Sequence, residues 1–400
     1  MNRMTRKIIS LALVLMLALS LLPASVFATA DSTVPVKAAT KAAGTSIQDG
    51  VTLHCWNWSY ANIQANLDKI AAAGYTAVQT SPVQPLKEGT NSSWSTYQGQ
   101  WWVFYQPTEF KINTSTNNAL GTKAQLKSLC EAAEQKGIKV IVDVVANHLA
   151  DNGGNNVSSA VPSYLRSNAA YWHDISRNTN NWWDRYEVTQ YCMAGLPDLN
   201  TGNKDIQNYV LTFLKECVDV GVDGFRFDAA KHIEVPEDTY CSSDFWPTVI
   251  NGIKSYKSDI YVYGEMLDDT GGVSYDTYTK YMSITDNRWG DNVRESVING
   301  GNAGNFSAYY NTNVAANKLV LWAESHDTYG NDDGASKYDS TQNINKTWAL
   351  VAARADAMSL YLARPSSMGI KLGTASTNTG WDWEEVVAVN KFHNDFAGQS

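Results

Sequence analysis

Apolar and polar residues alternate along the chain with two different periods. Short, nearly continuous apolar runs predict buried strands, and between them apolar residues recur every three or four positions, which predicts amphipathic helices. Eight runs predict strands, at residues 51–56, 75–80, 138–145, 222–228, 260–264, 281–285, 318–323 and 358–363. Helical patterns fall at residues 62–73, 123–135, 205–219, 293–298, 346–354 and 384–396.

Strands that alternate with helices predict parallel βαβ units. Eight such units predict an α/β fold closed into a (β/α)8 TIM barrel, with function at the C-terminal ends of the strands. An open doubly wound sheet is the alternative, but the glycine fingerprint of dinucleotide binding is missing from the sequence. We therefore predict that residues 47–147 and 201–400 form one catalytic barrel.

One connection is too long for a simple barrel loop. It runs from His148 to Asn200, between the third strand and its helix, and is rich in Asn, Trp, Tyr and Asp. A connection of this length is normally functional or a small subdomain. We predict that residues 148–200 form an inserted domain B.

The N-terminus has the pattern of an export signal. Arg3 and Arg6 precede the apolar run 8–22, which is short for a membrane span and is followed by small residues. This order predicts a signal peptide at residues 1–30 rather than a membrane anchor. Residues 31–46, rich in Ala, Thr and Ser, are predicted to be a leader. We expect a secreted, extracellular protein with no membrane association after cleavage.

Composition narrows the class of ligand. The chain carries 31 basic and 40 acidic residues, a net charge of −9, without a basic stripe, which argues against a nucleic-acid partner. The 14 Trp and 21 Tyr suit a neutral polar ligand such as a sugar, although they can equally fill a large core.

Five cysteines, an odd number, cannot all pair within the chain. None forms a CxxC motif, which argues against a thiolate metal cluster. Cys55, Cys130 and Cys217 lie in apolar patterns and are interpreted as buried thiols, whereas pairing of Cys192 with Cys241 stays open.

The stretch GFRFDAAKH, residues 224–232, ends the fourth predicted strand. Because strand side chains alternate, Arg226 and Asp228 share one face, which points inward in a barrel. A neighbouring arginine favours the ionised form of a carboxyl group, and an ionised carboxylate can act as a nucleophile. A buried structural Arg–Asp pair is the alternative.

Three other strands end in polar residues, with DVVANH at 143–148, YGE at 263–265 and ESHD at 324–327. Four such ends at one rim are hard to explain structurally, because unpaired buried charge is costly. Three carboxylates near one point predict glycoside cleavage, which uses a proton donor and a second carboxylate. We interpret Asp228 as nucleophile, Glu265 as acid/base, and Asp327 as the residue that raises the pKa of Glu265.

These motifs carry a family resemblance. The stretches DVVANH, GFRFDAAKH, YGEM and ESHDTYGND occur in this order, and HCWNWS, GYTAVQTSP, YQPT and VNKFHNDFAGQ add to them. From about residue 46 to 400 the chain resembles the α-amylases of glycoside hydrolase family 13, in particular the secreted Bacillus subtilis type. The resemblance implies retaining, endo-acting hydrolysis of α-1,4-glucans such as starch, amylose and maltooligosaccharides. It assigns Asp228 as nucleophile, Glu265 as acid/base and Asp327 as transition-state stabiliser.

The resemblance also implies substrate contacts. The residues that match sugar-binding positions of the family are Gln106, His148, Arg226, Lys231, His232 and His326. Trp101 and Trp102 stand where relatives place a tyrosine. Trp102 is expected to stack on a glucose ring, and core filling is the alternative.

A calcium ion between the barrel and the long loop is implied as well. Its ligands would be the side chains of Asn147 and Asp198 and the backbone carbonyls of Thr189 and His232. Calcium prefers several oxygen ligands, which a long loop can supply. For Asn147 alone, a loop cap is the alternative.

Other functions remain open at this point. The same barrel serves transglycosylating and debranching enzymes, and a non-catalytic α-glucan-binding relative is a further alternative. A metal-dependent barrel hydrolase would need His-x-His in the first strand, where this chain has His54-Cys55-Trp56. Relatives of this type continue into a β-sandwich domain, and since the sequence ends at Ser400 we expect that domain to be missing. We expect a monomer.

Overall fold

The computed structural model describes residues 46–90, 96–267, 275–301, 309, 313–331 and 335–397. All of them belong to one compact unit, Ala42–Ser400. The other unit, Met1–Lys41, and with it the predicted signal peptide, lies outside the described residues. Among the helices described, none is both long and apolar enough to cross a membrane.

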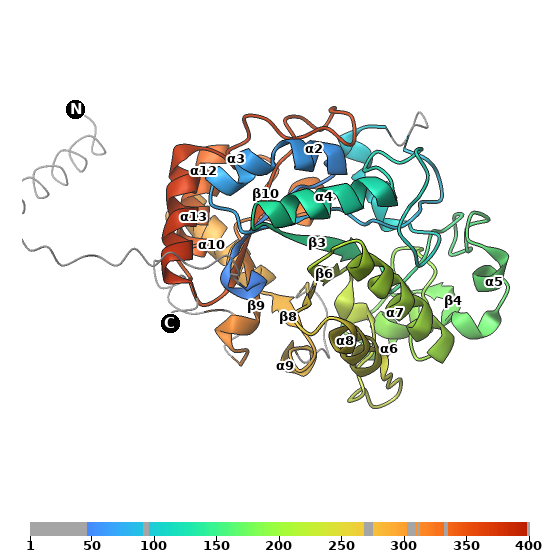
Figure 1. Cartoon of the computed structure of the whole chain (residues 1–400). Coiled ribbons are helices and arrows are strands. Elements are labelled where there is room, and N and C mark those ends of the chain that lie inside the picture. Colours follow the sequence, from blue (N-terminus) through green and yellow to red (C-terminus); the bar gives the residue numbers. More distant parts are fainter. Residues whose placement is uncertain are drawn as a thin grey trace, which may run out of the picture. The chain divides into compact units, whose positions relative to one another are not determined.

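Eight parallel strands close into the predicted barrel, in the order β1-β10-β9-β8-β7-β6-β3-β2. Figure 1 labels five of them, β3, β6, β8, β9 and β10. The strands are β1 (Val51–His54), β2 (Ala77–Gln79), β3 (Lys139–Val144), β6 (Gly224–Phe227), β7 (Tyr261–Gly264), β8 (Ser283–Thr285), β9 (Leu319–Trp322) and β10 (Met358–Leu362). Each lies within the apolar run that predicted it, so the predicted fold class is confirmed.

The strands are buried on both faces, which explains their continuous apolar sequences. One face contributes to a cluster made of Ile47, Ala77, Ile141, Tyr263, Val320, Trp322, Met358 and Leu360, and the other packs against the helices. A Cβ atom on Gly264 would lie 2.8 Å from Cβ of Ala230 and 2.9 Å from Cε of Met282. Only glycine fits there, and it lets β7 lead directly into Glu265.

Helices surround the strands (Figure 1). They are α2 (Tyr60–Ala65), α3 (Leu67–Ala72), α4 (Lys123–Gln135), α7 (Lys204–Asp219), α8 (Phe245–Tyr256), α9 (Tyr275–Tyr278), α10 (Asn287–Asn299), α11 (His326–Gly330), α12 (Thr341–Val351) and α13 (Glu384–Phe396), with short 3-10 turns η2 (Ile47–Asp49), η3 (Gln98–Tyr105), η5 (Ala230–His232) and η7 (Ala316–Lys318). The single helix predicted at 62–73 is wrong. It is divided at Asn66, which leaves helical geometry (φ −103°, ψ 3°) and donates its side-chain amide to the carbonyl of Asn62.

The inserted segment, residues 148–200, contains short elements that the sequence pattern did not reveal. They are α5 (Ser163–Arg166), η4 (Ala169–Tyr171), β4 (Asp174–Asn178), α6 (Arg185–Gln190) and β5 (Tyr191–Cys192). Its apolar cluster consists of Leu149, Val161, Leu165, Tyr171, Trp172 and Leu199, together with Ile206 of α7. The segment therefore packs against α7, beside which it lies in Figure 1.

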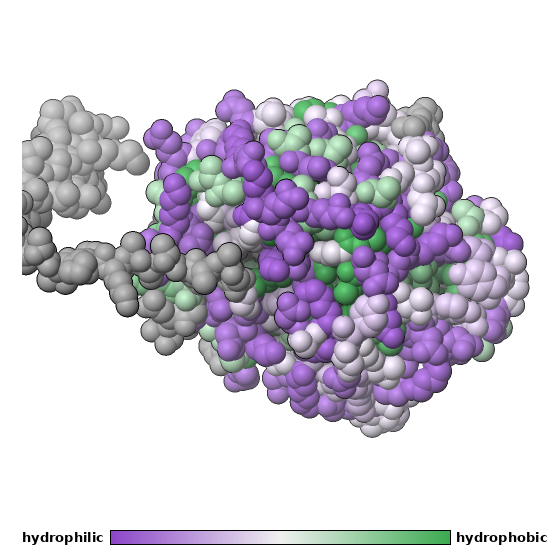
Figure 2. Space-filling model, viewed as in Figure 1, coloured by the Kyte–Doolittle hydropathy of each residue, from purple (hydrophilic) through white to green (hydrophobic). Residues whose placement is uncertain are grey.

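The face of the molecule shown in Figure 2 is mostly hydrophilic, with apolar residues scattered between polar ones. All five cysteines are in the described part of the chain and all are free. The pairing of Cys192 with Cys241, which the sequence left open, is therefore not formed.

Candidate active site

The C-terminal ends of the strands bring the three predicted acidic residues together. Asp228 follows β6, Glu265 follows β7, and Asp327 lies in the first turn of α11, which begins shortly after β9. All three line one cleft with a volume of about 370 Å³. The other predicted site residues that line it are Trp101, Trp102, Gln106, His148, Lys231, His232 and His326.

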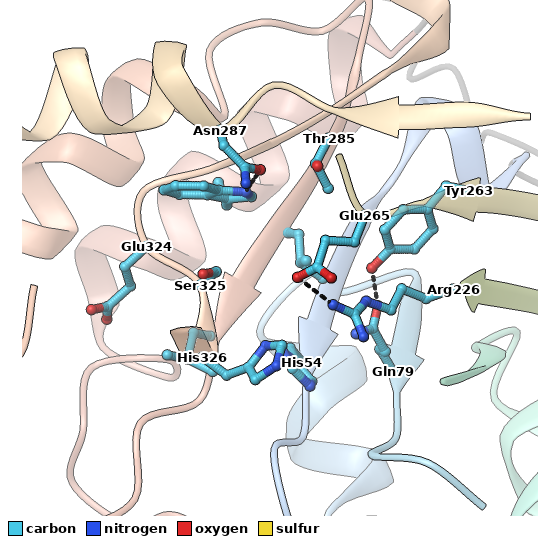
Figure 3. A pocket seen from close by; sticks show the side chains of 13 residues that line it. His54, Gln79, Arg226, Tyr263, Glu265, Thr285, Asn287, Glu324, Ser325 and His326 are labelled. Atoms are coloured by element: carbon cyan, nitrogen blue, oxygen red, sulfur yellow. Dashed lines mark hydrogen bonds and ion pairs between the residues drawn. The ribbon is translucent and has the colours of Figure 1, made fainter. Parts of the chain in front are cut away.

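Arg226 is buried beneath these carboxylates. Its Nη1 lies 2.8 Å from Oδ2 of Asp143 and 2.9 Å from Oδ1 of Asp228, and its Nη2 lies 2.6 Å from Oε1 of Glu265. Figure 3 shows the pair with Glu265 beside a cavity of only about 20 Å³, which His54 and His326 also border. The resemblance implied that Arg226 binds sugar; in the structure its guanidinium contacts three carboxylates, and it is not among the described residues that line the cleft.

Two neighbours position Glu265. Ala229, directly after Asp228, has a left-handed backbone (φ 48°, ψ 37°), a strained conformation for a residue with a side chain. Its amide donates to Oε2 of Glu265 at 3.0 Å. A hydrogen bond also joins Glu265 to Asp327, and Nδ2 of Asn331 lies 3.4 Å from Oδ1 of Asp327.

The site carries more carboxylates than Arg226 can neutralise. Burial raises the pKa of Asp228 to about 8, although Arg226 opposes this shift. Burial and the charge of Glu265 raise the pKa of Asp327 well above its usual value. Burial acts the same way on Glu265, but the charge of Arg226 and the hydrogen bonds from Asp327 and from the amide of Ala229 outweigh it and lower this pKa to about 2.

Arg226 was expected to favour the ionised form of Asp228, and it does so, although burial outweighs its effect on the pKa. Asp327 was expected to raise the pKa of Glu265, and this is wrong for the substrate-free site, because the hydrogen bond from Asp327 lowers that pKa. Arg226 is shared among three acidic groups, so its charge cannot compensate the burial of each one. Burial favours the protonated forms of Asp228 and Asp327, whereas the surroundings of Glu265 favour its ionised form.

The histidines of the cleft are neutral at pH 7. Burial lowers the pKa of His148 to about 4 and that of His326 to about 3. Nε2 of His148 donates to the carbonyl of Tyr105 at 3.0 Å, and its buried Nδ1 has no hydrogen-bond partner among the described residues. A buried acceptor without a partner is costly, so this nitrogen suits a hydroxyl group of a ligand.

The two predicted tryptophans differ in environment. Trp101 is buried, packs against Trp56, Tyr105 and His326, and donates Nε1 to the carbonyl of Gly330 at 3.2 Å. Trp102 is 37% exposed at the cleft. The stacking surface expected from the sequence is therefore available on Trp102, while Trp101 mainly fills the core.

Sequence reasoning missed several residues of this site. Further residues of the cleft are Tyr105, Trp182, Met193, Ala194, Leu196, Ala229, Leu267 and Asn331. Asp143 was quoted in its motif but given no role, although Tyr105 and Arg226 both hydrogen-bond it. Trp182 belongs to the aromatic-rich inserted segment, and its ring packs edge-on against His232 at 5.8 Å. That richness in Trp and Tyr was the available signal.

Two of the residues predicted to bind calcium, Asn147 and Asp198, lie in one buried network. Nδ2 of Asn147 donates to Oδ1 of Asp198 at 2.9 Å, and Oδ2 of Asp198 is 2.6 Å from Nδ1 of His173. Nε2 of His173 is 3.1 Å from Oε1 of Glu234. Burial raises the pKa of Asp198 to about 7, against the effect of His173.

The backbone carbonyl of Thr189 reaches the same network. The amide of Gln190 bonds both Glu234, at 2.6 Å, and the carbonyl of Thr189, at 2.9 Å. His232 is tied to this region through Nδ1, which lies 2.8 Å from the carbonyl of Val188. In the described part of the chain no three His, Cys, Asp or Glu side chains converge as a metal site, so a cation here would depend on amide and backbone oxygens.

Comparison with known proteins gives consistent results. The family model described as alpha amylase, catalytic domain, matches residues 63–286, more than half of the chain. An α-amylase of Clostridium acetobutylicum is 38% identical over 88% of this chain, and one of Butyrivibrio fibrisolvens is 34% identical over 87%. The chain spans 44% and 38% of the lengths of these two relatives. The crystal structure of α-amylase I from Eisenia fetida covers 88% of this chain and is itself covered to 78%, with a TM-score of 0.67 and 20% identity, which supports the fold.

Proposed function

Because the chain belongs to the α-amylase family, we propose that it is a retaining, endo-acting α-amylase that hydrolyses internal α-1,4-glucosidic bonds of starch and related glucans. The observation that carries this proposal is the placement of Asp228, Glu265 and Asp327 along one cleft. Asp228 and Glu265 contact the two terminal nitrogens of one guanidinium. Retention requires two carboxylates on the same cleft, one as nucleophile and one as acid/base, and these two residues can supply them.

In the first step, Asp228 attacks the anomeric carbon while Glu265 gives its proton to the glycosidic oxygen, which leaves with the other half of the glucan. A covalent glycosyl–Asp228 ester forms. In the second step Glu265 removes a proton from water, the water attacks the anomeric carbon, and the ester bond breaks. The product keeps the α configuration.

The reaction requires a proton on Glu265 and an ionised Asp228, which is the reverse of the pKa order described above. Transfer of one proton from Asp228 to Glu265 achieves this without changing the net charge. Once Glu265 is neutral, its charge no longer raises the pKa of Asp228 and Arg226 is left to stabilise that carboxylate.

Neutral side chains around the carboxylates suit a neutral polysaccharide. Nδ1 of His148 can accept a sugar hydroxyl, and the exposed indole of Trp102 can stack on the apolar face of a glucose ring. Lys231 and His232 line the same cleft as Asp228 and would contact the next sugar.

We also propose a structural calcium ion held by side-chain oxygens of Asn147 and Asp198 and by the carbonyls of Thr189 and His232. The donor set fits, because amide, carboxylate and carbonyl oxygens are the hard ligands that calcium prefers, and the carboxyl of Asp198 is buried. When bound, the ion would supply positive charge, and its ligands would come from the residues after β3, from the inserted segment and from η5. The residues named bind and orient; none takes part in bond cleavage.

Export and assembly state are further proposals. The basic start and short apolar run support secretion, as in the Bacillus subtilis type of α-amylase, and we propose a monomer. Sequencing of the N-terminus of protein recovered from the culture medium tests the first proposal: an intact Met1 would contradict it. Light scattering of the purified protein tests the second.

Proton NMR of amylose during digestion tests the enzymatic proposal. We expect α-anomeric oligosaccharides of intermediate length to appear first with the wild type, and none with Asp228→Asn. β-Anomers would refute retention, release of only one small product would refute endo action, and cyclic or transferred products would favour a transglycosylase.

A further inference from the structure

Arg185, the first residue of α6, connects the inserted segment to two parts of the barrel. Its side chain is 14% exposed. Nε and Nη2 form a fork with Asp238, at 2.9 and 2.7 Å. Nη1 donates to the carbonyl of Lys231, and Nη2 also contacts the hydroxyl of Tyr278 at 2.9 Å.

The partners of Arg185 fix the loop that follows Asp228, residues 229–238. Asp238 accepts a hydrogen bond from the amide of Val235 at 2.9 Å, which closes this loop on itself. The hydroxyl of Tyr278, in α9, donates to the carbonyl of Ile233 at 2.7 Å. Arg185 and Tyr278 thus hold the backbone on both sides of His232.

This loop and the inserted segment form facing parts of the cleft. Lys231 and His232 line it from the barrel, and Trp182 lines it from the inserted segment, three residues before Arg185. Arg185 itself is not among the described residues that line the cleft. The catalytic carboxylates are held separately, by Arg226 and by the amide of Ala229.

We propose that Arg185 is a positioning residue for substrate binding, which sets the place of Lys231 and His232 relative to Trp182 through Asp238 and Tyr278. The inference rests on the proposed action on α-glucans. A guanidinium is suited to this role because its planar fork bonds a carboxylate in two places and still has donors for the carbonyl and the hydroxyl. Lysine keeps the charge but cannot reproduce this set of bonds.

The test measures kcat and KM on maltoheptaose, and Kd for the same sugar from tryptophan fluorescence, which does not require turnover. For Arg185→Gln we expect KM and Kd to rise about tenfold, since a small misplacement of binding groups is costly. We expect kcat to change less than about twofold and its pH profile to stay the same, because the carboxylates keep their contacts. Arg185→Lys should give intermediate values.

Arg177→Gln is the matched control, because Arg177 is an arginine of the same segment with a side chain 62% exposed. Its KM and Kd should equal those of the wild type. Tyr278→Phe removes only a hydroxyl and gives a second test, with a smaller rise in KM, in case Arg185→Gln does not fold.

Unchanged KM and Kd in Arg185→Gln and Tyr278→Phe, or a loss confined to kcat, would overturn the inference. A wild type that binds maltoheptaose without hydrolysing it would overturn the proposed function, and the Kd values would still decide the role of Arg185.

Discussion

Replacement of Asp228 by asparagine should remove activity and at the same time stabilise the folded protein at neutral pH. Burial raises the pKa of Asp228 from 3.8 to about 8 in the folded state. An acid with a raised folded-state pKa costs no stability below pH 3.8, where it is protonated in both states. The cost grows as the pH rises towards 8, because only the unfolded chain can then release the proton.

The size of the effect follows from the shift. Each pH unit between the two pKa values corresponds to about 1.4 kcal/mol of stability. Between pH 4 and pH 7 the free energy of unfolding of the wild type should therefore fall by about 4 kcal/mol because of Asp228. Asp228→Asn has no proton to release at this position, so its free energy of unfolding should not show this fall. The expected observable is a stability difference between variant and wild type that widens with pH by this amount.

Urea unfolding followed by tryptophan fluorescence, at fixed ionic strength and several pH values from 4 to 8, measures the difference. The control is Asp68→Asn, whose side chain is 84% exposed and whose replacement should change stability by less than about 0.5 kcal/mol. A stability difference between variant and wild type that is constant with pH, or that narrows as the pH rises, would refute the reasoning. It would show that burial does not raise the pKa of Asp228 in the folded protein.

Four further predictions follow from the same geometry. Glu265→Gln should lower kcat on amylose about 10³-fold but spare the first step on a maltosyl fluoride, which needs no acid; equal losses on both substrates would remove Glu265 as proton donor. Added calcium should raise the Tm of the wild type and a chelator should lower it, and Asp198→Asn should abolish this response; a chelator without effect would eliminate the calcium site. Trp102→Ala should raise KM about tenfold through loss of stacking, with kcat maintained, and an unaltered KM would show that Trp102 does not contact sugar. Because all five cysteines are free, a reducing agent should leave the Tm unchanged, and a drop would indicate a disulfide.

The sequence predicted the barrel because each strand is buried on both faces and thus apolar throughout. Residues 138–145 and 222–228 are examples, since β3 and β6 fall inside them. The inserted segment escaped this reasoning. Its helices α5 and α6 have only four and six residues and few buried side chains, and are too short to show a period.

The convergence of Asp228, Glu265 and Asp327 was also predictable, because parallel strands of a barrel end at one rim. Their protonation was not. The protonation depends on how strongly the guanidinium of Arg226 interacts with each of Asp143, Asp228 and Glu265. These interactions are set by N···O distances of 2.6 to 2.9 Å, which the spacing of residues in the sequence does not encode. The same holds for Trp182, whose place at the cleft is decided by the packing of the inserted segment against His232.

Mass spectrometry of a trapped intermediate tests the central claim most directly. Glu265→Gln incubated with α-maltotriosyl fluoride should form the glycosyl ester but hydrolyse it slowly, because the base of the second step is missing. The account predicts a maltotriosyl adduct on the peptide that contains Asp228, absent when Asp228 is also changed to Asn. An adduct on another residue, or rapid hydrolysis that persists without Asp228, would contradict it.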